Sequence, residues 1–188
     1  MMRTLKILLF LFISCLCFGC QSSLRRESRI EKQDDVYVLS FANLSFSVSA
    51  GKGGRIVSFK CEDRELLTSD SVHSKYYGAT FWLSPQSEYW PQYQCVDELP
   101  YQAEIDKQIL RLVSPPDSIS GVSVTKEFSI SERDSSILIH YSVRNVSRQL
   151  KRLAPWDVTR VYGGLSFFPV GETDRMNKSD VTGGYEDK

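Results

Sequence analysis

Beyond its first twenty residues, the chain has a dominant hydrophobic period of two. Apolar and polar residues alternate in short runs, most clearly at Ile137, Ile139, Tyr141 and Val143. Such alternation predicts half-buried β-strands, because successive side chains of a strand point to opposite faces of the sheet. We expect strands at Val36–Val38, Leu44–Val48, Ile56–Phe59, Ile109–Val113, Val122–Ile130, Ile137–Val143, Asp157–Tyr162 and Leu165–Phe168.

Turn-forming residues separate these runs. Examples are the glycine-rich segment Ala50–Gly54, which has room for positive φ angles, Pro115-Pro116 and Gly163-Gly164. No window beyond the first twenty residues shows the i, i+3, i+4, i+7 apolar spacing of an amphipathic helix. Many short strands separated by turns are typical of an antiparallel sandwich or barrel, so the sequence predicts an all-β antiparallel β-sandwich.

The first twenty residues have the pattern of an export signal. Two positive charges, Arg3 and Lys6, precede an apolar run from Ile7 to Gly19, and Cys20 follows that run. The run is shorter than the about 20 apolar residues that a membrane-spanning helix needs. A small residue followed by cysteine resembles the lipobox of bacterial lipoproteins, in which the cysteine becomes the lipidated N-terminus.

This resemblance implies a signal peptide at residues 1–19 and a lipid anchor on Cys20, with the protein held in the bacterial cell envelope, at the outer membrane or the periplasmic face. Cys17 departs from the pattern, since Leu or Val is usual there. An ordinary secretory signal and an uncleaved membrane anchor are the alternatives. All three predict that the protein works outside the cytoplasm.

The remaining sequence divides into three parts. Residues 20–35 are polar and charged and predict a tether, residues 36–171 carry the strands of the domain, and residues 172–188 form a polar tail. The chain has 23 basic and 23 acidic residues, and two of the basic ones leave with the signal. The mature chain therefore lacks the basic surplus that binds phosphates, and we expect no nucleic-acid partner.

The cysteines and histidines give no clear chemical site. Cys61 and Cys95 lie outside the signal, and an oxidising envelope permits a disulfide between them without requiring it. No CxxC pair or histidine cluster is present, so we expect no metal and no cofactor. His73 falls in a polar loop and His140 on the strand face opposite the isoleucines, where an exposed histidine is the simplest interpretation.

All three tryptophans lie in two segments that mix aromatic and polar residues. Gly78–Gln92 contains Trp82, Gln86 and Trp90, and Ala154–Pro169 contains Trp156 and Arg160. Sugars present apolar C–H faces and rims of hydroxyl groups, which flat rings beside amide and guanidinium groups match. We therefore predict a carbohydrate-binding site at Trp82, Gln86, Trp90, Trp156 and Arg160, with burial of the rings in the core as the alternative.

Four segments in order resemble the galactose mutarotase-like superfamily, the relatives of aldose 1-epimerase, in a branch without a known activity. The segments are Gly53–Phe59, Phe81–Gln86 with Trp90-Pro91, Tyr141–Ser147 and Ala154–Arg160. The resemblance implies a two-sheet supersandwich whose concave face binds carbohydrate. It spans about Val36–Gly171, shorter than complete domains of this kind, so we expect the N-terminal part of a longer domain.

The same resemblance leaves catalysis undecided. Active mutarotases use histidines as acid and a late glutamate as base, whereas this chain has Trp156 and Arg160 where the first histidine region falls. Catalytic residues are therefore unknown. We expect a carbohydrate-binding envelope lipoprotein, with two alternatives: a sugar isomerase using Glu88 or Asp157 with His140, and a structural or assembly lipoprotein.

Overall fold

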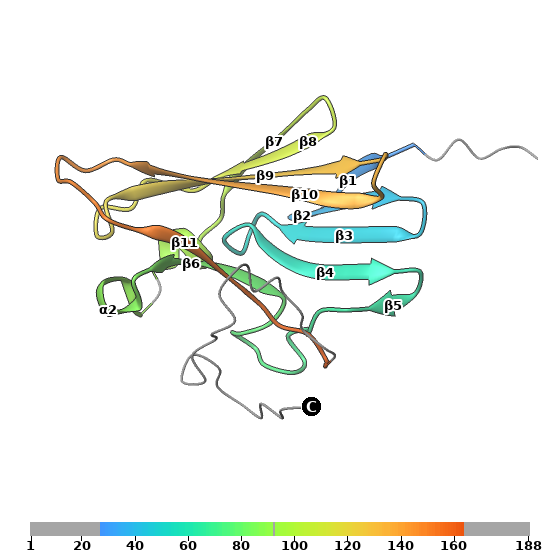
Figure 1. The fold of residues 1–188 in the computed structure, drawn as a ribbon, viewed down its shortest axis with the longest axis horizontal. Coiled ribbons are helices and arrows are strands. Elements are labelled where there is room, and N and C mark those ends of the chain that lie inside the picture. Colours follow the sequence, from blue (N-terminus) through green and yellow to red (C-terminus); the bar gives the residue numbers. More distant parts are fainter. Residues whose placement is uncertain (1–26, 92, 164–188) are drawn as a thin grey trace, which may run out of the picture.

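The computed structural model describes residues 27–91 and 93–163, which form two antiparallel β-sheets packed against each other (Figure 1). The larger sheet has the strand order β1-β2-β3-β4-β6-β11, with β5 paired to β4, and the smaller sheet has the order β10-β9-β8-β7. The all-β sandwich expected from the sequence is confirmed.

The bounds of the elements are as follows. The larger sheet consists of β1 (Arg29–Gln33), β2 (Val36–Phe41), β3 (Leu44–Ser49), β4 (Arg55–Cys61), β5 (Arg64–Glu65), β6 (Ala79–Ser84) and β11 (Ala154–Thr159). The smaller sheet consists of β7 (Gln102–Asp106), β8 (Ile109–Val113), β9 (Val122–Ser131) and β10 (Ser136–Asn145). Two short helices follow β6, α2 (Gln86–Tyr89) and α3 (Gln94–Asp97).

The core lies between the two sheets. Leu39 of β2, Leu110 of β8 and Val124 of β9 are fully buried there, and the rings of Phe46 and Phe128 meet across the sheets with centroids 5.7 Å apart. Each such side chain stabilises the fold by about 1.5–3 kcal/mol through burial. The period-two pattern therefore identifies the strands that present one face to this core.

The sequence placed some strands wrongly or missed them. The segment assigned to the tether contains β1, which pairs with β2 and has only Ile30 packed against the core, so no alternation marks it. The last described strand spans Ala154–Thr159 rather than Asp157–Tyr162, because an edge strand tolerates a proline such as Pro155. The signal, Cys20, the expected strand at Leu165–Phe168 and the tail lie outside the described residues.

The glycine turn between β3 and β4 holds the chain close to α3. Gly53 and Gly54 have φ angles of +62° and +60°, as expected for a turn that needs the left-handed region. A Cβ atom on Gly53 would lie 2.2 Å from the carbonyl group of Asp97. Glycine at this position thus lets the turn and the end of α3 approach each other.

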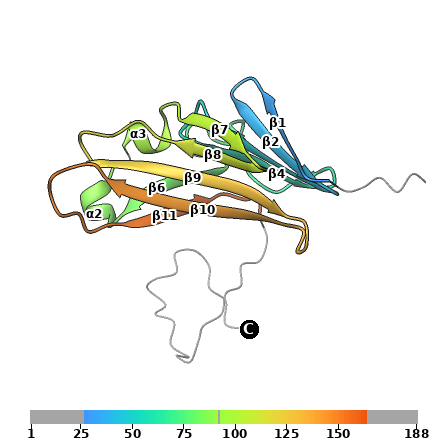
Figure 2. The same cartoon turned by 90° about the horizontal axis from the view of Figure 1, so that it is seen from above.

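The smaller sheet covers one face of the larger one, and α2 and β11 lie at the same end of the molecule (Figure 2). Among residues 27–91 and 93–163, no helix is long and apolar enough to cross a membrane.

Candidate functional site

The three tryptophans come together at one place on β6 and β11. Trp82 and Trp156 are directly opposite in the β6–β11 register, and their ring centroids lie 5.3 Å apart at an interplanar angle of 80°. Trp90, just after α2, lies 5.1 Å from Trp82 at an angle of 70°. We call Trp82, Trp90, Trp156 and the neighbouring Arg160 the tryptophan cluster.

This cluster lies on the face of the larger sheet that points away from the smaller one. Phe81 and Leu83 belong to the core between the sheets, so Trp82 between them points to the opposite face. Trp82 is 7% exposed and Trp90 is 44% exposed, while Trp156 is half-buried. The cluster therefore has a buried centre and an accessible rim.

Arg160 is fixed against the central tryptophan. Its guanidinium carbon lies 5.4 Å from the Trp82 ring centroid and 5.6 Å from that of Tyr76. Its Nη1 donates hydrogen bonds to Thr80 Oγ1 at 3.0 Å and to the Val158 carbonyl at 3.2 Å. Burial lowers the pKa of Arg160, but a guanidinium remains a cation at neutral pH. Tyr76 was not identified from the sequence as a member of this site.

Behind the rings, a buried carboxylate joins the cluster to β4. Asp97 Oδ2 accepts hydrogen bonds from Trp82 Nε1 and from Arg55 Nη2, both at 3.2 Å. Asp97 is 1% and Arg55 4% exposed. Burial raises the pKa of Asp97, although Arg55 and Trp82 act in the opposite direction. Asp97 Oδ1 and Arg55 Nε are buried without a hydrogen-bond partner in the described structure.

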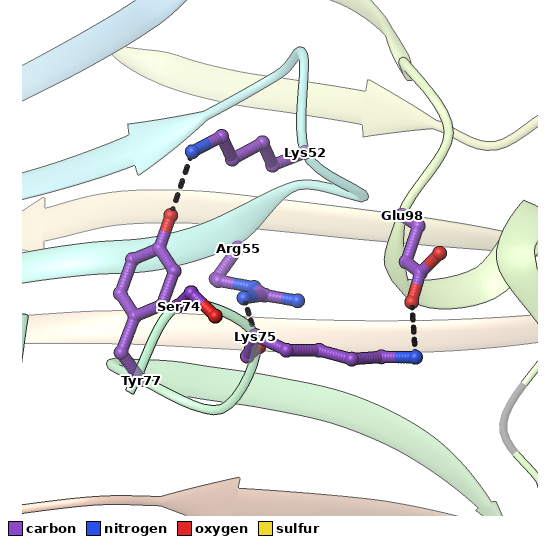
Figure 3. A pocket seen from close by; sticks show the side chains of 6 residues that line it. All are labelled: Lys52, Arg55, Ser74, Lys75, Tyr77 and Glu98. Carbon is purple, nitrogen blue, oxygen red and sulfur yellow. Dashed lines mark hydrogen bonds and ion pairs between the residues drawn. The ribbon is translucent and has the colours of Figure 1, made fainter. Parts of the chain in front are cut away.

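A cavity of about 320 Å³ adjoins this pair, lined by Lys52, Arg55, Ser74, Lys75, Tyr77 and Glu98 (Figure 3). Lys52 Nζ donates to Tyr77 Oη at 3.0 Å, and Lys75 Nζ pairs with Glu98 Oε1 at 3.1 Å. Arg55 Nη1 donates to the Lys75 carbonyl at 2.7 Å. We call this space the cationic cavity. Nothing in the hydrophobic pattern pointed to it.

Other expected site residues lie apart from these groups. Gln86 begins α2 with an exposed side chain, and within the described ranges this side chain makes no hydrogen bond. His140 is 73% exposed and pairs with Glu127 at 3.1 Å, whereas Asp157 Oδ2 accepts a hydrogen bond from Tyr141. Because His140 and Tyr141 are adjacent in β10, they point to opposite faces, and the structure does not bring His140 and Asp157 together.

The remaining candidates serve local structure. His73 is exposed, and its Nδ1 accepts hydrogen bonds from the backbone N–H groups of Lys75 and Tyr76. Cys61 and Cys95 are free thiols, so they do not form the disulfide that the sequence permits. In the part of the chain that the structure describes, no group of three or more potential metal ligands comes together.

No family model and no curated protein matches this chain.

Proposed function

We propose that this protein is a cell-envelope lipoprotein whose mutarotase-like domain binds carbohydrate at the tryptophan cluster, without evident catalysis. The observation that carries the proposal is the convergence of Trp82, Trp90, Trp156 and Arg160 on one sheet face, with Trp90 44% exposed. The exposed ring of Trp90 and the half-buried ring of Trp156 provide apolar surface for sugar C–H groups, and a fixed guanidinium provides donors for hydroxyl oxygens.

The position of the rings favours a binding surface over a purely structural role. The aromatic residues of the core pack between the sheets, as Phe46 and Phe128 do. Trp90 and Trp156 instead surround a buried ring on the outer face, where leaving an indole exposed forgoes the free energy of burial. The resemblance to mutarotase-like proteins supports the same interpretation.

Isothermal titration calorimetry with neutral and acidic oligosaccharides tests this proposal. We expect binding to the wild type, with Trp90→Ala and Trp156→Ala each weakening it by roughly three- to tenfold, the scale of one aromatic contact beyond its buried area. Leu150→Ala is the matched control, since Leu150 is an apolar side chain that is 99% exposed. Absence of heat with every sugar, from a protein shown to be folded, would reject carbohydrate binding.

The alternative of an envelope assembly protein is favoured by one observation, the 7% exposure of Trp82. In that case the cluster serves only stability, and no saccharide protects the chain against thermal unfolding. A sugar-induced rise of the unfolding midpoint that is lost in Trp90→Ala excludes this alternative.

A further inference from the structure

We propose that the cationic cavity binds the acidic group of the saccharide, a carboxylate or a sulfate, while the sugar ring lies against the tryptophan cluster. This inference rests on the proposed function and specifies its ligand as an acidic sugar, such as a uronic acid or a sulfated hexose. Three observations support it: the continuity of the two sites, the charges that line the cavity, and its size.

The cavity and the cluster are linked through Asp97 and Tyr76. Arg55 lines the cavity, and its guanidinium binds the same oxygen of Asp97 as the Trp82 indole does. Lys75 also lines the cavity, and its Nζ lies 5.8 Å from the ring centroid of Tyr76. That ring in turn lies 6.2 Å from Trp82. These contacts make the two sites neighbours, and we infer that one ligand spans them.

The lining of the cavity has more positive than negative side chains. Lys52, Arg55 and Lys75 face it, against Glu98 as the acidic lining residue and Asp97 buried behind Arg55. Lys52 donates to the hydroxyl of Tyr77 and not to a carboxylate, and this hydrogen bond raises the pKa of Lys52, with Asp70 acting in the same direction. Because the whole chain has a formal net charge of zero, this excess is local.

The arrangement of these side chains suits an anion entering from solvent. Figure 3 shows Lys52 with Tyr77 at one end, the Lys75–Glu98 pair at the other, and Arg55 between them. Both lysines are exposed, so they can reorient toward a ligand, whereas Arg55 is held in place. The volume of about 320 Å³ falls at the lower end of small-molecule sites, which are about 300–1,000 Å³.

Substitutions in the Lys75–Glu98 pair should change the affinity for an acidic sugar in opposite directions. An incoming carboxylate competes with Glu98 for Lys75, so removal of the Glu98 charge frees the cation for the ligand. We expect Lys52→Gln and Lys75→Gln to weaken binding of an acidic sugar and Glu98→Gln to strengthen it. Each change amounts to roughly three- to tenfold, the effect of one partly exposed charge-assisted contact.

The experiment measures affinities for the full chain by isothermal titration calorimetry in two arms. One arm compares tri-galacturonate with its methyl ester, and the other compares galactose 6-sulfate with galactose. We expect each acid to bind at least about tenfold tighter than its neutral counterpart, an advantage that falls as salt rises. The two arms show whether carboxylate or sulfate is preferred. Lys60→Gln, which removes an exposed lysine of β4 outside the cavity, leaves both affinities unchanged.

The outcomes separate this inference from the proposed function. Equal affinities for the acids and their neutral counterparts overturn the inference while carbohydrate binding stands. The inference is also overturned if Lys52→Gln and Lys75→Gln leave the affinity for acidic sugars unchanged, as Lys60→Gln does. It is likewise overturned if Glu98→Gln weakens binding of the acidic sugars. If neither acids nor neutral sugars bind, the proposed function fails and the inference fails with it. Circular dichroism spectra that match the wild type establish that each variant is folded.

Discussion

We expect the buried amine of Lys126 to make the stability of this protein increase with pH from neutral to alkaline conditions. Lys126, on β9, points between the sheets and is 1% exposed. Its Nζ donates to the carbonyl groups of Gly53 at 2.6 Å and Gly54 at 3.3 Å and lies 5.1 Å from the Phe81 ring centroid. Burial lowers the pKa of Lys126 to about 7, although Asp97 and Asp157 favour its charged form.

The magnitude follows from proton linkage. In the unfolded chain this lysine titrates near 10.5, so between pH 7 and pH 9 the unfolded state binds a proton that the native state has released. The unfolding free energy then rises with pH, by at most about 1.36 kcal/mol per pH unit for one group. Over the two pH units from pH 7 to pH 9, we expect the unfolding free energy to increase by about 2 kcal/mol.

The other shifted groups act outside this window. The pKa values of Tyr101 and Tyr141 are raised by burial, so their contributions are lost only above their unfolded values near 10. Burial also raises the pKa of Cys95, whose model-peptide value is 9.0, and its contribution falls only as pH exceeds that value. The interval from pH 7 to pH 9 therefore reports chiefly on Lys126.

Urea unfolding followed by circular dichroism at pH 7, 8 and 9 measures this slope, and Lys126→Met is the matched variant. Methionine fills a similar volume without a titrating group, so we expect its stability to be level across the window. A wild type whose stability is level or falling from pH 7 to pH 9, or a methionine variant that keeps the slope, would show that the amine is not held neutral.

Four further changes have defined outcomes. Trp82→Ala removes the centre of the tryptophan cluster and should lower the unfolding free energy by about 3–5 kcal/mol in urea titrations. Gly53→Ala places a Cβ atom 2.2 Å from backbone atoms of Asp97 and should reduce the thermal midpoint, whereas Lys107→Ala in the turn between β7 and β8 should not. Burial raises the pKa of Glu65, but hydrogen bonds from Ser58 and three backbone N–H groups outweigh this effect and lower the pKa. The ionised Glu65 therefore stabilises the native state, and this contribution is lost as pH falls through the pKa of the folded protein. Glu65→Gln should accordingly make the unfolding free energy less dependent on pH in the acid range. Cys20→Ser should abolish incorporation of labelled palmitate, and labelling that persists in this variant would contradict lipidation at Cys20.

How far the sequence predicts this fold depends on how each strand is buried. β2 and β9 alternate because one face meets the core, and their positions were predicted. β6 is buried at five of its six positions and on both faces, which removes the alternation, and β7 is mostly exposed. Neither has the period-two signal, although both are strands.

The same contrast holds for the candidate site. The tryptophan cluster was predicted from its residue types, since aromatic rings and a guanidinium concentrated in two segments indicate a surface of particular chemistry. The Arg55–Asp97 pair joins residues 42 positions apart. The cationic cavity joins the turn between β3 and β4, β4 itself, the loop before β6 and the residue after α3. Such contacts arise only when the chain folds, so spacing along the sequence gives no sign of them.

Asp97 explains why the tryptophan cluster and the cationic cavity lie side by side. A carboxylate at 1% exposure is unfavourable by several kcal/mol unless it is paired, and here one oxygen has two donors while the other has none among the described residues. Apolar residues of similar volume are often as stable as a buried ion pair, so stability alone does not account for Arg55 and Asp97. Departures from local stability of this kind are expected where a protein binds or reacts. The carboxylate orients the Trp82 indole on one side and the Arg55 guanidinium on the other, so one buried group holds both the centre of the tryptophan cluster and a lining residue of the cationic cavity.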